Sequence, residues 1–346
     1  MDDLRLAIFG CGFWAQFQIA AWRELPGVQV VALYNRTRAR ADALATMFDI
    51  PAVYDDPETL LRTESLDAMD IITDVGSHRR FVELAAAHRL PVICQKPMAP
   101  MLADAQVMVA ACKSAGVPLI IHENWRWQTP LRELKRLLDS GTIGAPFRAR
   151  VQFACSFPVF DNQPFLKQLD QFILMDIGSH ILDAARFLFG DAQQLYCQTA
   201  RVNPDIKGED VATVMLKQGG VTCTCEMSYA SRLEHERFPQ TYVLIEGEQG
   251  SLELGFDYWI RQTTAAGTFA CRMPPPHYAW ADPAYDLVHA SIVPCNENSI
   301  QALRGGRTAE TSGDDNLKTM QLVFSAYDSA RDGQAILIEA AKVALS

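Results

Sequence analysis

Short, almost continuously apolar runs alternate with helix-like segments through the first third of the chain. Five of these runs are predicted as strands, at residues 4–10, 29–35, 68–73, 91–95 and 117–123. Strands that are buried on both faces have this composition, and a parallel sheet covered by helices buries both faces. The alternation therefore predicts βαβ units in an α/β domain of the Rossmann type, with a doubly wound parallel sheet. The helix-like segments lie at residues 14–25, 37–48, 79–89 and 101–116.

The pattern changes after residue 123, where antiparallel features replace the βαβ alternation. A helix pattern at 130–144 leads into a predicted strand at 146–157. Two hairpin patterns follow, with turns at residues 218–220 and 248–250. We expect a Rossmann domain over residues 1–122 and an α+β domain with a mostly antiparallel sheet over residues 123–346. An amphipathic helix at 314–331 is expected near the end of the chain.

The composition narrows the class of protein. A chain of 346 residues is long enough for two domains, and its formal net charge of −10 argues against binding to nucleic acid or to anionic lipid. No apolar run approaches the length of a membrane span, and the short acidic start MDDLRLAIFG does not read as a signal peptide. The nine cysteines form no C-x-x-C pair and lie mostly in apolar runs, so we expect reduced thiols in a cytoplasmic protein rather than a zinc site.

The sequence GCGFWA, residues 10–15, follows the first predicted strand and opens the first predicted helix. Gly10 permits a tight turn, Gly12 lets a pyrophosphate approach the backbone, and the helix N-terminus favours its negative charge. Ala15 stands at the third glycine position of the usual motif, where helix and strand pack closely. In this position the motif predicts a dinucleotide-binding turn.

The second predicted strand ends on Asn35, where the residue that reads the adenosine ribose is expected. An acid is common here in enzymes that use NAD, because a carboxylate repels the 2′-phosphate of NADP. Asn35 can hydrogen-bond the ribose hydroxyls as a neutral partner, and Arg36, Arg38 and Arg40 lie nearby. NAD is the expected cofactor, and NADP stays an alternative.

Lys96 directly follows the fourth predicted strand, within the sequence QKP. This is the carboxyl edge of the sheet, where ligands bind in open α/β folds. The proline that follows holds the lysine in an extended conformation. A lysine at a strand end also suits plain exposure to solvent, and the residue alone does not decide between the two.

The stretch MDIGSHILD, residues 175–183, places Asp176 and His180 four positions apart at a predicted helix start. On one helical face they could form a helix cap, part of a metal site with Asp183, or a proton-transfer pair. Histidine changes charge near neutral pH, and no further clustered ligands accompany it. Proton transfer is therefore favoured and no metal is expected, with Asp183 binding a charge or a hydroxyl.

Six motifs together resemble the Gfo/Idh/MocA oxidoreductases, a family named for glucose–fructose oxidoreductase and inositol dehydrogenase. The similarity runs over nearly the whole chain. It implies a Rossmann domain, a second domain whose open-faced sheet commonly mediates homodimers or homotetramers, and a catalytic trio that matches Lys96, Asp176 and His180. The motifs are GCGFWA (10–15), TDVGSH (73–78), QKP (95–97), ENWRW (123–127), DIGSH (176–180) and GDDNLKTMQLVFSAYDSA (313–330).

Two positions depart from the family pattern. The usual E-K-P is Q-K-P, so Gln95 replaces a glutamate that typically contacts the nicotinamide ribose, and the usual T-P is Thr73-Asp74. For two further residues, the sequence leaves two possible roles open. Trp125 can line the site or belong to the core, and Arg126 can pair with cofactor phosphates or with an internal acid.

A narrower likeness, in CQKPMAP (94–100), SFPVFDNQPFL (156–166) and HASIVPCNEN (289–298), points to family members that oxidise a branched pentose in its furanose form. It implies oxidation of the anomeric carbon to a lactone, with His180 as base, Asp176 orienting it and Lys96 stabilising the C1 oxygen. The alternatives are another aldose or polyol, an NADP-linked reaction, a redox-neutral glycosidase, or a dinucleotide-binding transcriptional regulator.

The expected site residues form two sets that overlap at Lys96. The cofactor set is Gly10, Gly12, Phe13, Trp14, Asn35, Arg36, Arg40, Thr73, Asp74, Val75, His78, Gln95, Lys96, Asn124 and Trp125. The sugar set is Lys96, Glu123, Arg126, Asn162, Gln163, Asp176 and His180.

Overall fold

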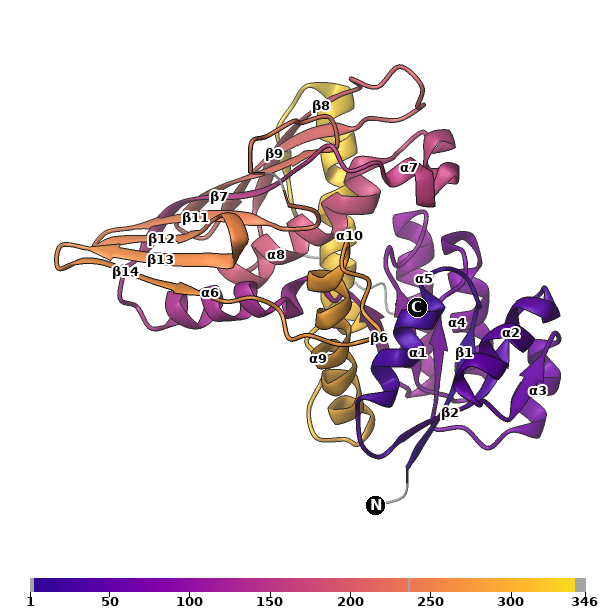
Figure 1. Cartoon of the computed structure of the whole chain (residues 1–346). Helices are drawn as coiled ribbons and strands as arrows, with labels where there is room; N and C mark the ends of the chain where they lie inside the picture. The colour runs from indigo at the N-terminus through magenta and orange to yellow at the C-terminus, as the bar shows by residue number, and fades with distance from the viewer. Residues whose placement is uncertain (1–2, 236, 340–346) are drawn as a thin grey trace.

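The first sheet contains six parallel strands in the order β3-β2-β1-β4-β5-β6. The computed structural model describes residues 3–235 and 237–339 (Figure 1). All five strands predicted in the first third are present, which confirms the parallel α/β class. The sixth, β3, was not predicted because it is three residues long and only half-buried. The strands are β1 (Leu4–Phe9), β2 (Val28–Tyr34), β3 (Ala52–Tyr54), β4 (Ala68–Ile71), β5 (Val92–Gln95) and β6 (Leu119–His122).

Helices cover both faces of this sheet, as near-continuous apolar strands require. Phe9 and Ile71 pack on one face with Phe81 of α4, whereas Ile8 and Trp22 belong to the core on the other face, with α1 and α2. A doubly wound sheet places the carboxyl ends of its strands at one edge, and the loops that follow them meet there. The helices are α1 (Ala15–Arg23), α2 (Arg38–Phe48), α3 (Pro57–Thr63), α4 (His78–Ala87) and α5 (Leu102–Ala115).

The second sheet has nine strands in the order β14-β13-β12-β11-β7-β10-β9-β8-β15. Only the pair of β7 and β10 is parallel among the described strands, so the sheet is mostly antiparallel as predicted. Both hairpins turn where the sequence indicated. The strands are β7 (Pro146–Ala154), β8 (Gln194–Ala200), β9 (Val211–Gln218), β10 (Val221–Ser228), β11 (Tyr242–Gly247), β12 (Gly250–Leu254), β13 (Trp259–Thr264), β14 (Gly267–Arg272) and β15 (Ile336–Leu337).

Helices lie on one face of the second sheet, and no described helix covers the other (Figure 1). The covering helices are α6 (Thr129–Asp139), α8 (Ser179–Phe189) and α10 (Gly313–Asp332). Strand β9 shows the consequence, because its residues alternate between buried and exposed, with Met215 48% exposed. The domain is therefore open-faced.

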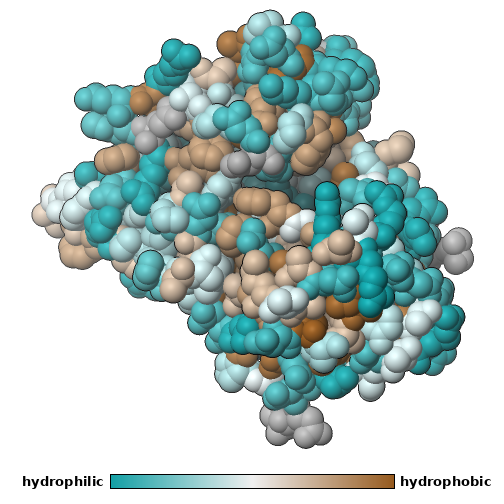
Figure 2. All heavy atoms as spheres, turned by 45° about the vertical axis from the view of Figure 1, so that its right-hand side comes forward, coloured by the Kyte–Doolittle hydropathy of each residue, from teal (hydrophilic) through white to brown (hydrophobic). Residues whose placement is uncertain are grey.

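Helix α9 (Asp286–Leu303) packs against the first half of the chain and was not predicted from the sequence. Its Pro294 and its many buried polar residues mask the helical pattern. Ile292 and Val293 pack on Phe17 and Ala21 of α1, so this late helix joins the first domain to the second. Figure 2 shows the surface hollowed where the two halves meet, with apolar side chains gathered along the recess.

The turn after β1 provides a test of local strain. Gly10 has φ +105°, and a Cβ there would lie 2.6 Å from the Ile72 carbonyl oxygen, whereas a Cβ on Gly12 would meet nothing within 4 Å. We expect Gly10→Ala to lower the free energy of unfolding by roughly 1–3 kcal/mol from backbone strain alone. Gly12→Ala should change it by about 0.5 kcal/mol or less. Urea denaturation of both variants measures the difference, and equal stabilities would contradict the expectation.

Candidate active site

Lys96 lies directly after β5 and reaches across to the second half of the chain. Its Nζ is 3.1 Å from Asp176 Oδ1 and 3.2 Å from the Asp176 carbonyl oxygen. Both side chains are about one-fifth exposed, at 21% and 18%, so the pair lies at the edge of the recess rather than in the core. The structure thus brings together two members of the predicted trio from opposite halves.

Asp176 lies in a π-helical turn, Leu174–Gly178, which precedes α8. A π turn adds a residue to the helical repeat, so the four-residue spacing no longer places Asp176 directly below His180. Its second carboxylate oxygen, Oδ2, accepts a hydrogen bond from the Tyr229 hydroxyl at 3.2 Å. The described residues show no hydrogen bond between Asp176 and His180, because this carboxylate is engaged by Lys96 and Tyr229. The role of Asp176 in orienting His180 stays a prediction.

The carboxylate that contacts His180 is Glu123, at the end of β6. Glu123 Oε1 lies 2.5 Å from His180 Nδ1, and both side chains are buried. The same oxygen accepts the Trp125 backbone N–H at 3.1 Å, which fixes the carboxylate. The Trp125 indole stacks on the imidazole, with ring centroids 4.3 Å apart. His180 is held from two sides, and its Nε2 makes no hydrogen bond with any residue that the structure describes.

Burial decides the charge of this pair. It raises the pKa of Glu123 to about 7, because an isolated buried carboxylate is poorly solvated. Burial also lowers the pKa of His180, and the nearby Lys96 cation lowers it further. The imidazole is consequently neutral near pH 7, the form in which a histidine can accept a proton.

Arg126 faces the interior and not the recess. Its Nε and Nη2 atoms donate to both oxygens of Asp183 at 2.7 and 2.6 Å, and Nη2 also donates to Asp315 at 3.0 Å. Asp183 accepts a further bond from the Thr319 hydroxyl. Arg126 was expected to bind sugar, and this is corrected, because its guanidinium is paired with the internal acids Asp183 and Asp315. Pairing with an internal acid was the alternative that the sequence left open. Asp183 binds a charge and a hydroxyl, as predicted.

The expected cofactor residues fall into a group at the sheet edge and a group held in the interior. The edge group lies near the ends of neighbouring parallel strands. Gly12 leaves open space for an approaching group, and Asn35 Oδ1 accepts the Cys11 N–H at 3.1 Å and so fixes the turn. These features fit a bound dinucleotide. The edge group is Gly10, Gly12, Phe13, Trp14, Asn35, Arg36, Arg40, Thr73, Asp74, Val75 and Lys96.

The interior group is held by internal hydrogen bonds instead. Asn124 Nδ2 donates to the Val288 carbonyl and the Ser291 hydroxyl, and Trp125 Nε1 donates to Thr241. His78 lies between two backbone carbonyls. These side chains support the site from behind, and their assignment as direct cofactor contacts stays a prediction.

Two polar residues of the site region were not predicted. Tyr229 follows β10 and contacts Asp176, and His122 ends β6 and contacts the Gln95 side chain. The position of His122 at the end of a parallel strand was a usable signal, whereas nothing in the sequence linked Tyr229 to Asp176. Gln163 is half-buried after α7 (Val159–Asn162), and the side chain of Asn162 lies outside the described part of the structure.

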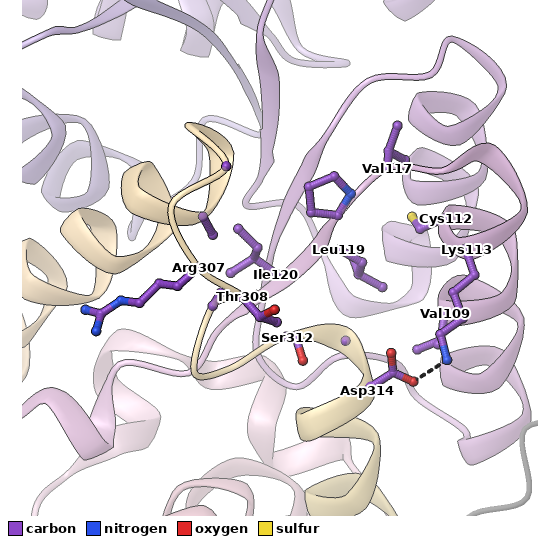
Figure 3. Close-up of a pocket in the computed structure, with 15 residues that line it drawn as sticks. Val109, Cys112, Lys113, Val117, Leu119, Ile120, Arg307, Thr308, Ser312 and Asp314 are labelled. Atoms are coloured by element: carbon purple, nitrogen blue, oxygen red, sulfur yellow. Dashed lines mark hydrogen bonds and ion pairs between the residues drawn. The ribbon is translucent and has the colours of Figure 1, made fainter.

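A pocket of about 480 Å³ lies at the opposite edge of the first sheet, where β6 begins (Figure 3). It lies between α5 and the loop that leads into α10, and the ion pair of Lys113 with Asp314 closes one side. It contains none of the residues described above, so it is separate from the candidate site.

Three negative findings apply to residues 3–235 and 237–339. No group of three His, Cys, Asp or Glu side chains is placed to hold a metal ion. No helix in this range is long and apolar enough to cross a membrane. The nine cysteines, all within this range, form no disulfide, and eight of them are buried, as their apolar surroundings in the sequence indicated.

Comparison with known families and proteins gives matches along most of the chain. Residues 4–123 match the family described as an oxidoreductase family with an NAD-binding Rossmann fold, and residues 131–253 match the GFO/IDH/MocA C-terminal domain. A D-apiose dehydrogenase of Paraburkholderia graminis is 46% identical over 95% of this chain and 88% of that protein. A D-apiose dehydrogenase of Rhizobium rhizogenes is 42% identical over 98% of this chain and 99% of that protein.

A solved structure is also closely similar. It is an oxidoreductase from Agrobacterium radiobacter in complex with NAD+, L-tartaric acid and magnesium, which is 41% identical with a TM-score of 0.95. The alignment covers 97% of this chain and 98% of that one. The predicted family resemblance is confirmed, and the two relatives above are both named D-apiose dehydrogenases.

The Arg126 cluster provides a stability prediction. We expect Arg126→Met to lower the free energy of unfolding by roughly 3–5 kcal/mol, because it leaves the buried Asp183 carboxylate without its partner. Lys318→Met is the control, since Lys318 pairs with Asp191 at the surface, 47% and 53% exposed, and its loss should cost about 1 kcal/mol or less. Chemical denaturation measures both. A similar decrease in the free energy of unfolding of both variants would show that the buried cluster stabilises the protein no more than a surface ion pair does.

Proposed function

This chain belongs to the Gfo/Idh/MocA oxidoreductase family, and we propose that it is a dehydrogenase that oxidises the anomeric carbon of D-apiose, in its furanose form, to D-apionolactone. Membership makes it an NAD-binding oxidoreductase. The observation that carries the finer proposal is the meeting of Lys96 with Asp176, and of His180 with Glu123, at the ligand-binding edge of the Rossmann sheet. The two relatives above 40% identity supply the substrate.

Oxidation of a hemiacetal removes a hydride from C1 and a proton from its hydroxyl. Bound NAD supplies the hydride acceptor. The protein must accept the proton and stabilise the negative charge that develops on the C1 oxygen. His180 provides the neutral base, and Lys96 provides the cation that donates to that oxygen.

Asp176 acts in this proposal on the lysine. Its carboxylate and its backbone carbonyl both accept from Lys96 Nζ, and Tyr229 holds the other carboxylate oxygen. A lysine side chain is flexible, and two acceptors on one residue fix where its third donor can point. Asp176 is therefore a positioning residue for Lys96.

Glu123 decides which nitrogen of His180 carries the proton. When Glu123 is ionised, Nδ1–H donates to it, and the lone pair of Nε2 is free to accept the substrate proton. When Glu123 is protonated, its O–H donates to Nδ1, so Nε2 carries the hydrogen and cannot act as a base. The oxidation therefore requires the ionised form of a group whose pKa is about 7.

The open face of the second sheet supports a proposal about assembly. Apolar side chains are exposed on this face, among them Met215 at 48% and Trp259 at 37%. We expect a second copy of the chain to cover this face, in a homodimer or homotetramer. Cysteines that form no disulfide in the described range suit a reducing compartment, so we place the enzyme in the cytoplasm.

The substrate proposal predicts formation of NADH when the purified protein is mixed with NAD and D-apiose. Lys96→Ala and His180→Ala should each lower kcat by about 100-fold or more, because each removes a group that acts in the transition state. Absorbance in the near ultraviolet measures the product, with a panel of aldoses and polyols and with NADP as comparisons. Turnover on another sugar would overturn the substrate, and no turnover despite dinucleotide binding would favour a regulator or a redox-neutral glycosidase.

The tautomer argument predicts a pH profile. The wild-type kcat/KM for oxidation should rise with pH through about 7, as Glu123 loses its proton. Glu123→Gln should remove this rise, because a neutral amide does not titrate in this range. It should lower kcat by roughly 100- to 10,000-fold, because it no longer stabilises the imidazolium that forms when His180 accepts the proton. Asp176→Asn, which alters the lysine instead, should keep the rise. A profile of Glu123→Gln that still rises near pH 7 would contradict the role of Glu123.

A further inference from the structure

Five buried polar side chains form a continuous line of hydrogen bonds that ends beside the catalytic lysine. Gln18 Nε2 donates to Asp70 Oδ2 at 3.1 Å and lies 3.2 Å from Asn296 Oδ1. The same Asn296 oxygen lies 3.0 Å from His122 Nε2. His122 Nδ1 lies 3.2 Å from Gln95 Nε2, and Gln95 Oε1 accepts the Lys96 backbone N–H at 3.2 Å.

The line crosses both halves of the molecule. Asp70 comes from β4, Gln18 from α1, His122 from β6 and Gln95 from β5, whereas Asn296 comes from α9. Four of these side chains are completely buried, and Gln95 is 9% exposed. Buried polar groups must be satisfied by one another, so the direction of each bond constrains the next.

Asp70, at the end of the line away from Lys96, determines which partner donates in each hydrogen bond. Trp22 Nε1 donates to Asp70 Oδ2 at 2.8 Å, and burial raises the pKa of Asp70 to about 6, so the carboxylate is ionised above that pH. An ionised carboxylate only accepts hydrogen bonds, so Gln18 must present its NH₂ group. That group also faces Asn296, which must therefore present its oxygen.

The donor and acceptor of each remaining hydrogen bond, up to Lys96, follow from this orientation of Asn296. Because Asn296 presents an oxygen, His122 must donate from Nε2. Burial lowers the pKa of His122 to about 4, so the ring is neutral and its Nδ1 must accept. Gln95 therefore donates its N–H to Nδ1 and turns its oxygen to the Lys96 N–H. In this arrangement every bond in the line pairs one donor with one acceptor, while Gln18 Oε1, Asp70 Oδ1 and Asn296 Nδ2 have no hydrogen-bond partner among the described residues.

We infer that Gln95 is a positioning residue for Lys96, and that the line of Asp70, Gln18, Asn296 and His122 requires a neutral amide at position 95. The inference rests on the proposed catalytic role of Lys96. A glutamate, which stands here in the usual E-K-P motif, offers no donor to His122 when ionised. It fits the line only with one additional proton, carried either by the carboxyl group or by the imidazole.

Other titratable groups surround the line, and a test must separate their effects. His180 lowers the pKa of His122 in addition to the effect of burial. These groups ionise in the parent enzyme and in the Gln95→Glu variant alike. The ratio of the activity of the variant to that of the parent therefore isolates the effect of the change at position 95. The groups carried by the packed elements are Asp70 on β4, Cys94 and Lys96 at β5, Glu123 after β6, His180 on α8 and Cys295 on α9.

The first measurement uses the unliganded protein and no turnover, so it stands even if D-apiose is not the substrate. Long-range ¹H–¹⁵N spectra of histidine-labelled protein at pH 9 report which ring nitrogen carries hydrogen, and His122→Asn identifies the signal. The parent should show His122 protonated at Nε2 only. Gln95→Glu should show Nδ1 protonated. A parent ring protonated at Nδ1 would overturn the inference even if Gln95→Glu does not fold.

The second measurement follows kcat/KM from pH 6 to 9, with the sugar that the panel identifies. The ratio of Gln95→Glu to the parent should fall about tenfold per pH unit above the apparent pKa that the introduced carboxyl group shares with His122, because one proton is lost. Gln218→Glu is the matched control, since Gln218 is also buried but donates to Ala185 and Gly190 in the other domain. Its ratio should be flat. A flat ratio for Gln95→Glu, with the tautomer unchanged, would overturn the inference.

Discussion

The buried ion pair between Arg126 and Asp183 fixes the two halves of the candidate active site relative to one another. Arg126 comes from the segment after β6, which also carries Glu123, and Asp183 lies three residues after His180 on α8. Fixing α8 against this segment brings His180 to Glu123, and it brings the preceding π turn to Lys96. Removing two charges from water is expensive, so the pair is stable only because Asp315 and Thr319 complete its hydrogen bonds.

Burial then sets the chemistry of the groups that this scaffold positions. The same desolvation that raises the pKa of Glu123 lowers that of His180, so one proton is shared between two groups that both favour their neutral forms. A base that is neutral at rest and oriented through its second nitrogen is what removal of a hydroxyl proton requires. Lys96, at the edge of the recess, is held in place by Asp176.

Sequence patterns were sufficient for elements whose burial is uniform or strictly alternating. The parallel strands of the first domain and the two hairpins of the second were predicted because each has a clear period. Strand β3 and helix α9 were missed for opposite reasons. The first is too short for a pattern, and the second buries so many polar residues, such as Asn296 and His289, that no apolar stripe is visible.

The sequence by itself determined the Rossmann turn at Gly10 and Gly12 and the family, and it predicted the trio of Lys96, Asp176 and His180, because these depend on residue types at short spacings. Only the tertiary structure decided which acid contacts which base. A π turn displaces Asp176 toward Lys96, and Glu123, 57 residues before His180, occupies the place that the four-residue spacing had assigned to Asp176. Local spacing predicts contacts only where the helical repeat is regular, and partners brought from distant strands leave no trace in it.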